Sequence, residues 1–254
     1  MIPYGRQHIS EEDIAAVTAV LRSDFLTQGP AIERFEQKMA AYCGVPYALA
    51  VSNATAALHI GYQALGMAPG KRGWTSPNTF VASANGFLYC GGEVDFVDID
   101  AGTLNLSVAA LAEKLEAAAQ VGTLPHIVTP VHFGGQSCDM AAIHAFSQRY
   151  GFKVVEDASH AVGGSYRDEK VGACTYSDLA IFSFHPVKII TTGEGGMLLT
   201  RSRDLYEQLL RLRSHGITRD PALMHEANPS PWVYEQQELG FNYRMTDIQA
   251  ALGA

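Results

Sequence analysis

The sequence of 254 residues is poor in charge, poor in cysteine and without long hydrophobic runs. Only 17% of its residues are charged, and 18 Lys and Arg stand against 26 Asp and Glu, which gives a formal net charge of −8. This acidic balance argues against nucleic acid or an anionic membrane as the main partner, because both require a basic surface. No apolar run approaches the roughly 18 residues that a membrane span needs. The first residues contain neither the cationic nor the apolar segment of a secretory signal, so we expect a cytoplasmic protein.

The common metal and nucleotide motifs are missing as well. The four cysteines lie at least 36 residues apart, so no Cys-x-x-Cys pair exists, and we expect reduced, mostly buried thiols. There is no Walker A motif, and Leu198 stands where the last glycine of a dinucleotide fingerprint would follow the glycines at 193, 195 and 196. His225 and Glu226 lack the second histidine of a zinc protease motif. The usual signatures of ATP, NAD and zinc are therefore absent.

What the sequence does contain is an alternation of helical and strand patterns, with a hydrophobic share of 47% that is ample for a packed core. This alternation predicts an α/β fold with a largely parallel sheet. A capping box of Ser10 and Asp13 opens the first helix. The apolar face of that helix would consist of Ile14, Val17, Val20 and Leu21. We expect further helices over residues 54–65, 104–119, 140–150 and 204–215, and strands over residues 47–51, 93–99, 126–131, 152–155, 179–184 and 197–200.

Residues 52–55, Ser-Asn-Ala-Thr, stand at the junction of an expected strand and the helix that follows it. The free N–H groups of a helix N-terminus, together with hydroxyl side chains, can bind a phosphate. Most turns of this kind only cap their helix, so the motif by itself leaves both interpretations open.

Residues 154–160, Val-Val-Glu-Asp-Ala-Ser-His, place Asp157 at the end of an apolar strand, where open α/β sheets bind their ligands. A carboxylate there can pair with a protonated ring nitrogen, an interaction worth about 1–4 kcal/mol at a separation of 4 Å, depending on the dielectric constant. The alternative is a helix N-cap, which is the more common role of such an aspartate.

Lys188 follows the strand expected at residues 179–184 and has Val187, Ile189 and Ile190 as neighbours. Burial lowers the pKa of a lysine and makes its amine nucleophilic enough to form a Schiff base. A loop lysine is normally solvated, and these apolar neighbours disfavour that alternative. A fourth segment, residues 240–247, leads into the final helix and by itself indicates no more than capping. A phosphate site, an aspartate and a Schiff-base lysine on strand ends are together what pyridoxal 5'-phosphate requires.

In these residues and their flanking stretches, the sequence resembles the DegT/DnrJ/EryC1/StrS family of sugar-nucleotide aminotransferases, which are pyridoxal-phosphate enzymes of fold type I. The matching stretches cover essentially the whole chain and are SDFLTQGP, SNATAALH, SPNTFVASAN, PVHFGG, VVEDASHA, FSFHPVKIITTGEGG, RSHGIT and GFNYRMTDIQAALG. The resemblance implies a mixed, mostly parallel central sheet sandwiched by helices. Residues 70–74, Gly-Lys-Arg-Gly-Trp, depart from the apolar strand usual before SPNTF, which puts the pairing of that strand in doubt.

The resemblance also implies a role for each site residue. Lys188 would bind the cofactor as a Schiff base and move a proton between substrate and cofactor, while Asp157 would pair with the pyridine nitrogen. Phe80 would stack on the ring, with His160 beside its polar edge. The residues expected to hold the phosphate are Ala54, Thr55, Ser183 and the partner subunit's Asn242, which implies a homodimer with shared active sites. Weaker candidates for substrate contact are His215, Tyr243 and Arg244, and no metal is implied.

Within the family, residues 4–7, 23–30, 184–197 and 231–247 most resemble the members that act in pseudaminic acid biosynthesis. The implied reaction is transamination at C4 of a UDP-linked 4-keto-6-deoxy-N-acetyl amino sugar by L-glutamate, giving UDP-4-amino-4,6-dideoxy-N-acetyl-β-L-altrosamine and 2-oxoglutarate. Lys188 argues against the sugar dehydratases of the family, which have a histidine in its place. Two alternatives remain open, namely another keto sugar nucleotide as substrate, or a fragment that binds pyridoxal phosphate without activity.

The family pattern also divides the chain. We expect residues 1–238 to form the cofactor-binding large domain with its N-terminal segment, and residues 239–254 to begin a small C-terminal domain. Residues 219–238, with three prolines and mixed charge, are predicted to form an excursion or lid. The helix that Thr246 opens stops after two turns, so we expect the chain to be truncated relative to its family.

Overall fold

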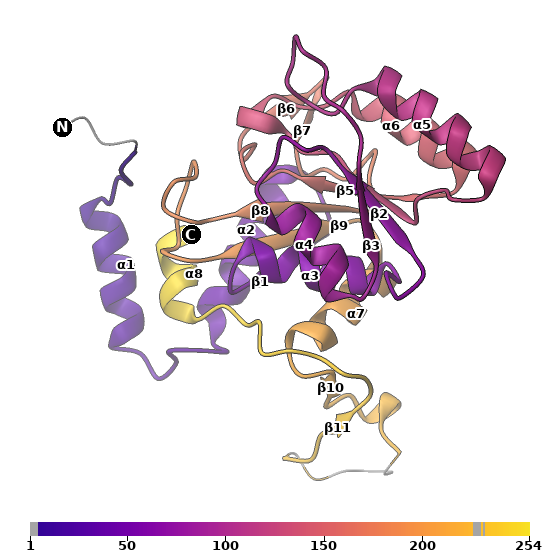
Figure 1. Cartoon of the computed structure of the whole chain (residues 1–254). Helices are drawn as coiled ribbons and strands as arrows, with labels where there is room; N and C mark the ends of the chain where they lie inside the picture. Colours follow the sequence, from indigo (N-terminus) through magenta and orange to yellow (C-terminus); the bar gives the residue numbers. More distant parts are fainter. Residues whose placement is uncertain (1–4, 226–229, 231) are drawn as a thin grey trace.

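The centre of the molecule is a seven-stranded sheet with the strand order β1-β9-β8-β5-β4-β2-β3 (Figure 1). The computed structural model describes residues 5–225, 230 and 232–254. Its central strands are β1 (Tyr47–Val51), β2 (Arg72–Thr75), β3 (Glu93–Phe96), β4 (Ile127–Thr129), β5 (Lys153–Asp157), β8 (Leu179–Ser183) and β9 (Gly196–Thr200). Strand β9 runs antiparallel to both its neighbours, and all the other pairs are parallel. The predicted mixed, mostly parallel sheet is confirmed.

Helices cover both faces of this sheet, except that α1 (Glu11–Leu21) stands away from the sheet and packs against α8 (Asp247–Gly253) (Figure 1). The other helices are α2 (Pro30–Cys43), α3 (Ala54–Ala64), α4 (Ala82–Tyr89), α5 (Val108–Val121), α6 (Met140–Tyr150) and α7 (Arg203–Arg213). Two small ladders lie outside the sheet, one of β6 (Ser165–Tyr166) with β7 (Glu169–Lys170), the other of β10 (Ile217–Thr218) with β11 (Glu235–Gln236). Strands β10 and β11 project from the body at the bottom of Figure 1. The excursion predicted at residues 219–238 lies in this region, and its residues 226–229 and 231 are outside the described part.

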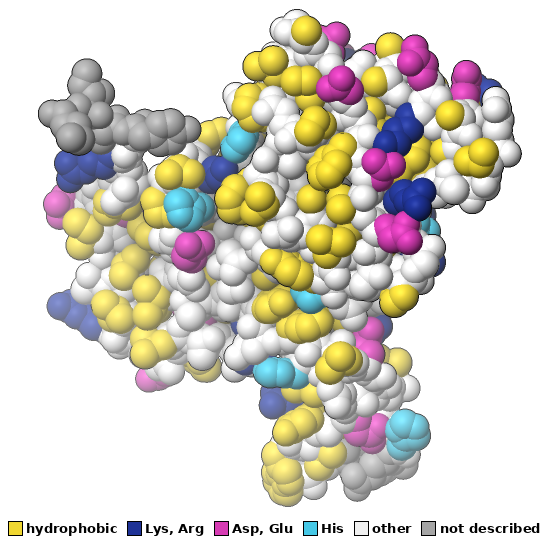
Figure 2. Space-filling model, viewed as in Figure 1, with side chains coloured by type: hydrophobic (Ala, Val, Ile, Leu, Met, Phe, Trp, Pro, Cys, Tyr) yellow, Lys and Arg dark blue, Asp and Glu magenta, His cyan; other side chains and the backbone are white. Residues whose placement is uncertain are grey.

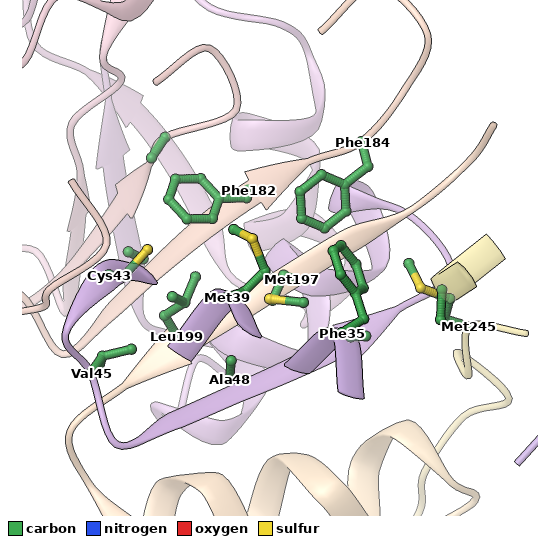
Figure 3. Close-up of a cluster of buried hydrophobic side chains, with 14 of the residues drawn as sticks. Phe35, Met39, Cys43, Val45, Ala48, Phe182, Phe184, Met197, Leu199 and Met245 are labelled. Atoms are coloured by element: carbon green, nitrogen blue, oxygen red, sulfur yellow. The ribbon is translucent and has the colours of Figure 1, made fainter. Parts of the chain in front are cut away.

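Alternation along the strands sorts the side chains into two core layers. In β8, Leu179 and Ile181 pack with α3 and α7, whereas Ala180 and Phe182 point to the other face and pack with α2. Figure 3 shows this second layer, in which Phe35 of α2 lies against Phe184 with ring centroids 5.1 Å apart. A further cluster on the same face lies beneath α5 and α6. Each face of the sheet is thus dry, as a parallel sheet requires.

Several predicted elements need correction at their ends. The helix expected from residue 104 begins at Val108, because Ser107 caps it and Leu106 bridges to Ile99 instead. The strand expected over residues 93–99 ends at Phe96. In α1, Val20 is buried, but Ile14 and Leu21 are about half exposed, so the apolar stripe is not a core face. Helices α2 and α4 were not among the predicted elements.

Strand β2, whose pairing the charged sequence put in doubt, is fully paired with β3 and β4. Gly73 makes this possible, because a Cβ at that position would lie 2.4 Å from the ring of Phe87 on α4. The charges stay at the edge of the sheet, where Arg72 pairs with Glu93 and Lys71 donates to the carbonyl of Gly66 at 2.6 Å. The Phe87 ring of α4 therefore fills the space that an apolar side chain of the strand would otherwise occupy.

The surface and the thiols follow the composition. On the face drawn in Figure 2, Lys and Arg side chains are scattered or lie beside acidic ones. Lys114, for example, pairs with Asp95 at 2.8 Å. All four cysteines are free, and Cys43, Cys138 and Cys174 are buried, as expected. Within the described ranges, no helix combines the length and the apolar character needed to cross a membrane.

Candidate functional site

A cavity of about 610 Å³ lies at the edge of the sheet where β1, β5 and β8 end and β9 begins. Seven of the predicted cofactor residues line it: Ala54, Thr55, Phe80, Asp157, His160, Ser183 and Lys188. Parallel strands explain this convergence, because their carboxyl ends, and the loops that follow them, meet at one edge. The structure thus brings together residues that lie up to 134 positions apart in the sequence.

Strand alternation selects which of two adjacent carboxylates faces the cavity. Glu156 points to the opposite side of the sheet, where it accepts a hydrogen bond from His132 at 2.8 Å. Asp157 is 4% exposed and points toward α4, where its Oδ2 accepts from the Ser83 hydroxyl at 2.6 Å. Its Oδ1 accepts from the N–H of Ser159 at 3.2 Å. A carboxylate with four acceptor sites retains capacity for a donor in the cavity.

Lys188 and His160 are half-buried beside this carboxylate. Burial lowers the pKa of the Lys188 amine, and the charge of Asp157 opposes that shift. Burial, and then the charge of Lys188, lowers the pKa of His160. The N–H of Gly134 donates to His160 Nδ1 at 3.3 Å, so the neutral ring carries its proton on Nε2. Val187, by contrast, is 57% exposed, so the expectation that this neighbour buries the lysine is wrong.

The N-terminus of α3 forms one wall. Asn53 caps the helix by accepting from the N–H of Ala56 at 2.8 Å, which leaves the N–H groups of Ala54 and Thr55 without an acceptor in the described part of the chain. Gly196 holds this turn close to the sheet, because a Cβ there would lie 2.6 Å from the Ala54 nitrogen. Ser183 pairs with Gly196 on the adjacent strand. Two amides and the hydroxyls of Thr55 and Ser183 therefore face one end of the cavity, which is a donor set suited to a phosphate.

Phe80 supplies the aromatic surface of the cavity. Its side chain is 69% exposed, although a phenyl ring normally contributes to the core. It follows β2 at the same edge of the sheet and lines the cavity together with Thr79. An exposed ring in this place is suited to stack on a planar ligand.

The remaining predicted residues lie elsewhere, along the end of β1. Arg244 bridges to Val51, and the carbonyl of Tyr243 accepts from the N–H of Ser52 at 2.8 Å. Asn242 and His215 are exposed, and His215 has a φ of 64°, an unusual conformation for a residue other than glycine. None of the four lines the cavity of its own chain.

Sequence reasoning missed two hydroxyls of the site. Ser83 and Thr79 lie four residues apart in the SPNTFVASAN stretch, and their oxygens are 2.7 Å apart. No helical spacing rule predicts this contact, because Thr79 lies before α4, which begins at Ala82.

Comparisons with known proteins agree with this geometry. Residues 7–254 match the DegT/DnrJ/EryC1/StrS aminotransferase family. The chain is 42% identical over 252 residues to the spore coat polysaccharide biosynthesis protein SpsC of Bacillus subtilis. It is 39% identical over 254 residues to the UDP-4-amino-4,6-dideoxy-N-acetyl-β-L-altrosamine transaminase of Campylobacter jejuni.

Solved structures show the same fold. Helicobacter pylori PseC, an aminotransferase of pseudaminic acid biosynthesis, superimposes with a TM-score of 0.89 at 31% identity over 99% of this chain. The PLP form of the putative sugar aminotransferase Spr1654 from Streptococcus pneumoniae gives a TM-score of 0.84 at 26% identity over 99% of this chain. The chain spans 62% of the length of SpsC, 63% of the C. jejuni transaminase, 63% of PseC and 65% of Spr1654.

Proposed function

Because the chain belongs to the DegT/DnrJ/EryC1/StrS aminotransferase family, we propose that it binds pyridoxal 5'-phosphate in the cavity at the carboxyl edge of the sheet and transaminates a sugar nucleotide. The observation that carries the proposal is the convergence of the Lys188 amine, the Asp157 carboxylate and the free N-terminus of α3 on one cavity. When bound, the cofactor supplies an aldehyde that condenses with amines and a ring that withdraws electrons.

The residues present fit that group. The amides of Ala54 and Thr55 and the hydroxyl of Ser183 would hold its phosphate, and Phe80 would cover its ring. Asp157, which Ser83 and Ser159 fix in place, would accept a hydrogen bond from the ring nitrogen and keep it protonated. A buried, charge-assisted hydrogen bond of this kind is worth about 1.5–3 kcal/mol.

Lys188 would transfer the protons of the reaction. Its lowered pKa makes the neutral amine available at a pH where a solvated lysine is charged. As a general base it would take the proton from the α-carbon of the amino donor, and as a general acid it would deliver one to C4 of the sugar. His160, neutral and protonated on Nε2, would be a hydrogen-bond donor that adds no positive charge to the site.

For the substrate, we propose the reaction that the family resemblance implies: L-glutamate gives its amino group to C4 of a UDP-linked 4-keto-6-deoxy-N-acetyl amino sugar, forming UDP-4-amino-4,6-dideoxy-N-acetyl-β-L-altrosamine and 2-oxoglutarate. The C. jejuni relative, which is named as the transaminase of this sugar nucleotide, supports the choice. The likeness to PseC supports this choice and the place in pseudaminic acid biosynthesis. The similarity to SpsC keeps another keto sugar nucleotide as the competing substrate.

We further propose that two copies of the chain share their sites. Asn242 and His215 are exposed and do not line the cavity of their own chain, although they lie near the end of β1. A second copy would bring them, with Tyr243 and Arg244, to the opposite wall. This arrangement gives a role to the exposed His215, whose strained backbone is of a kind often found at functional sites.

An amino-transfer assay tests the proposal. The chain, loaded with pyridoxal phosphate, is mixed with L-glutamate and either the UDP-4-keto sugar or a panel of other UDP- and dTDP-keto sugars, and 2-oxoglutarate is measured. The expected result is stoichiometric 2-oxoglutarate and 4-amino sugar, with loss of turnover in Lys188→Ala. Turnover by Lys188→Ala would refute the role of the lysine, and a preference for another keto sugar would replace the proposed substrate.

A further inference from the structure

Three side-chain oxygens form a continuous chain from the cavity wall into the protein. Thr79 Oγ1, which lines the cavity, lies 2.7 Å from Ser83 Oγ, and Ser83 Oγ lies 2.6 Å from Asp157 Oδ2. The Ser83 side chain is fully buried. Hydroxyl–carboxylate bonds of this length are charge-assisted and among the stronger hydrogen bonds in proteins.

The direction of this chain follows from chemistry. An ionised carboxylate can only accept, so the Ser83 hydroxyl proton points to Asp157. The Ser83 oxygen must then accept from the Thr79 hydroxyl. Aligned hydrogen bonds of this kind polarise one another, so Thr79 strengthens the bond that Ser83 donates.

The backbone of Ser83 is also held in place by its neighbours. The Tyr62 hydroxyl donates to the Ser83 carbonyl at 3.0 Å, and the Tyr62 ring stacks on Phe87 with centroids 4.1 Å apart. Phe87 in turn occupies the space above Gly73. The backbone of the serine is therefore held by contacts that involve β2, α3 and α4.

We propose that Ser83 is a positioning residue, whose hydroxyl, oriented by Thr79, keeps the Asp157 carboxylate directed at the ring nitrogen of the cofactor. This inference rests on the proposed function, because it concerns how tightly that cofactor is held. Ser83 touches neither cofactor nor substrate and acts through Asp157 alone.

The test measures the dissociation constant of pyridoxal phosphate by equilibrium dialysis at pH 8. It compares the wild type with Ser83→Ala, Ser83→Thr and Thr79→Val, and with the control Ser147→Ala. Ser147 is also a buried hydroxyl, but it bonds to the His144 carbonyl on α6, away from the cavity. Lys188, His160 and Tyr62 are the other titratable groups that face Asp157, and every variant retains them.

We expect Ser83→Ala to bind the cofactor about tenfold more weakly at pH 8, the factor that corresponds to loss of a charge-assisted hydrogen bond. Thr79→Val should weaken binding by a smaller factor. Ser83→Thr, which keeps the hydroxyl, and Ser147→Ala should resemble the wild type.

Wild-type affinity in Ser83→Ala would overturn the inference. An equal loss of affinity in Ser83→Thr would overturn it too, because that result indicates a role in packing and not in hydrogen bonding. If Ser83→Ala does not fold, the affinity of Thr79→Val decides. A wild type that binds no pyridoxal phosphate would refute the proposed function and this inference with it. If the wild type binds the cofactor and Ser83→Ala binds it equally well, only this inference is refuted.

Discussion

Replacing Gly196 with alanine perturbs the phosphate end of the cavity through its backbone, without substituting any residue expected to contact the cofactor. The glycine begins β9 and lies directly beneath the first turn of α3. An added Cβ would lie 2.5 Å from the carbonyl carbon of Asn53 and 2.6 Å from the nitrogen of Ala54. Both neighbours are backbone atoms, so no side-chain rotation can relieve the contact.

The size of the effect follows from these distances. The separation of 2.6 Å must open to the 3.4 Å at which ordinary contact begins, so the N-terminus of α3 has to move by about 0.8 Å. A misplacement of about 1 Å at a binding or catalytic group can cost up to a hundredfold. We therefore expect the affinity for pyridoxal phosphate to fall ten- to a hundredfold, and overpacking to lower the free energy of unfolding by about 1–3 kcal/mol.

Absorbance titration with pyridoxal phosphate gives the affinity, and urea unfolding of the same samples gives the stability. Gly61→Ala is the matched control, because it lies further along the same helix and its Cβ would meet only the side-chain tips of Leu179 and Leu198 at 3.2 Å. That variant should bind the cofactor as the wild type does. Wild-type affinity in a folded Gly196→Ala protein would show that the first turn of α3 does not hold the phosphate.

Three further predictions concern a helix cap, a packing contact and a pKa. Asp247→Ala removes the acceptor for the N–H groups of Gly29 and Ala31, at 2.7 and 2.9 Å, so urea unfolding should show a loss of about 1–3 kcal/mol, and an unchanged midpoint would contradict this. Gly73→Val drives a side chain into the Phe87 ring and should lower the melting temperature by several degrees or abolish folding, whereas a normal melting curve would show that α4 can move away freely. Because burial lowers the pKa of Lys188, its rate of attachment to pyridoxal phosphate should rise with pH to a midpoint below 10.5, and Asp157→Asn should lower that midpoint further by removing the charge that opposes the shift. A wild-type midpoint at or above 10.5 would refute the burial of the amine.

Elements with local signals were predictable from the sequence. Strand β1 spans Tyr47–Val51 and helix α6 spans Met140–Tyr150, as expected, because apolar patterns and caps lie within each segment. The cap predicted at Thr246 is likewise present, and Gln249 completes a capping box there. In each case the information that sets the boundary lies within a few residues of it.

Elements fixed by distant contacts were not predictable. No local side chain caps α2, and its first N–H groups are bound by Asp247, more than 200 residues away. Leu104 has a φ of 61°, which delays the start of α5 despite the helical pattern around it. Tertiary structure decides both boundaries.

The residues of the candidate site also fall into those that the sequence could predict and those that it could not. Asp157, Ser183 and the first turn of α3 follow strands directly, so the parallel sheet alone brings them to one edge. Ser83 depends on how α4 packs across Gly73, and no local pattern predicts that packing. The specific roles of Lys188 and its neighbours were read from family resemblance, because chemistry by itself left capping and solvation as alternatives.

Identification of the covalently labelled lysine tests the central claim most directly. The wild-type chain is loaded with pyridoxal phosphate, reduced with borohydride, digested and mapped by mass spectrometry, with Lys188→Ala treated in parallel. The account predicts the added mass of the reduced cofactor on Lys188 and no label in the variant. A label on a different lysine, or cofactor bound without any label on Lys188, would contradict it.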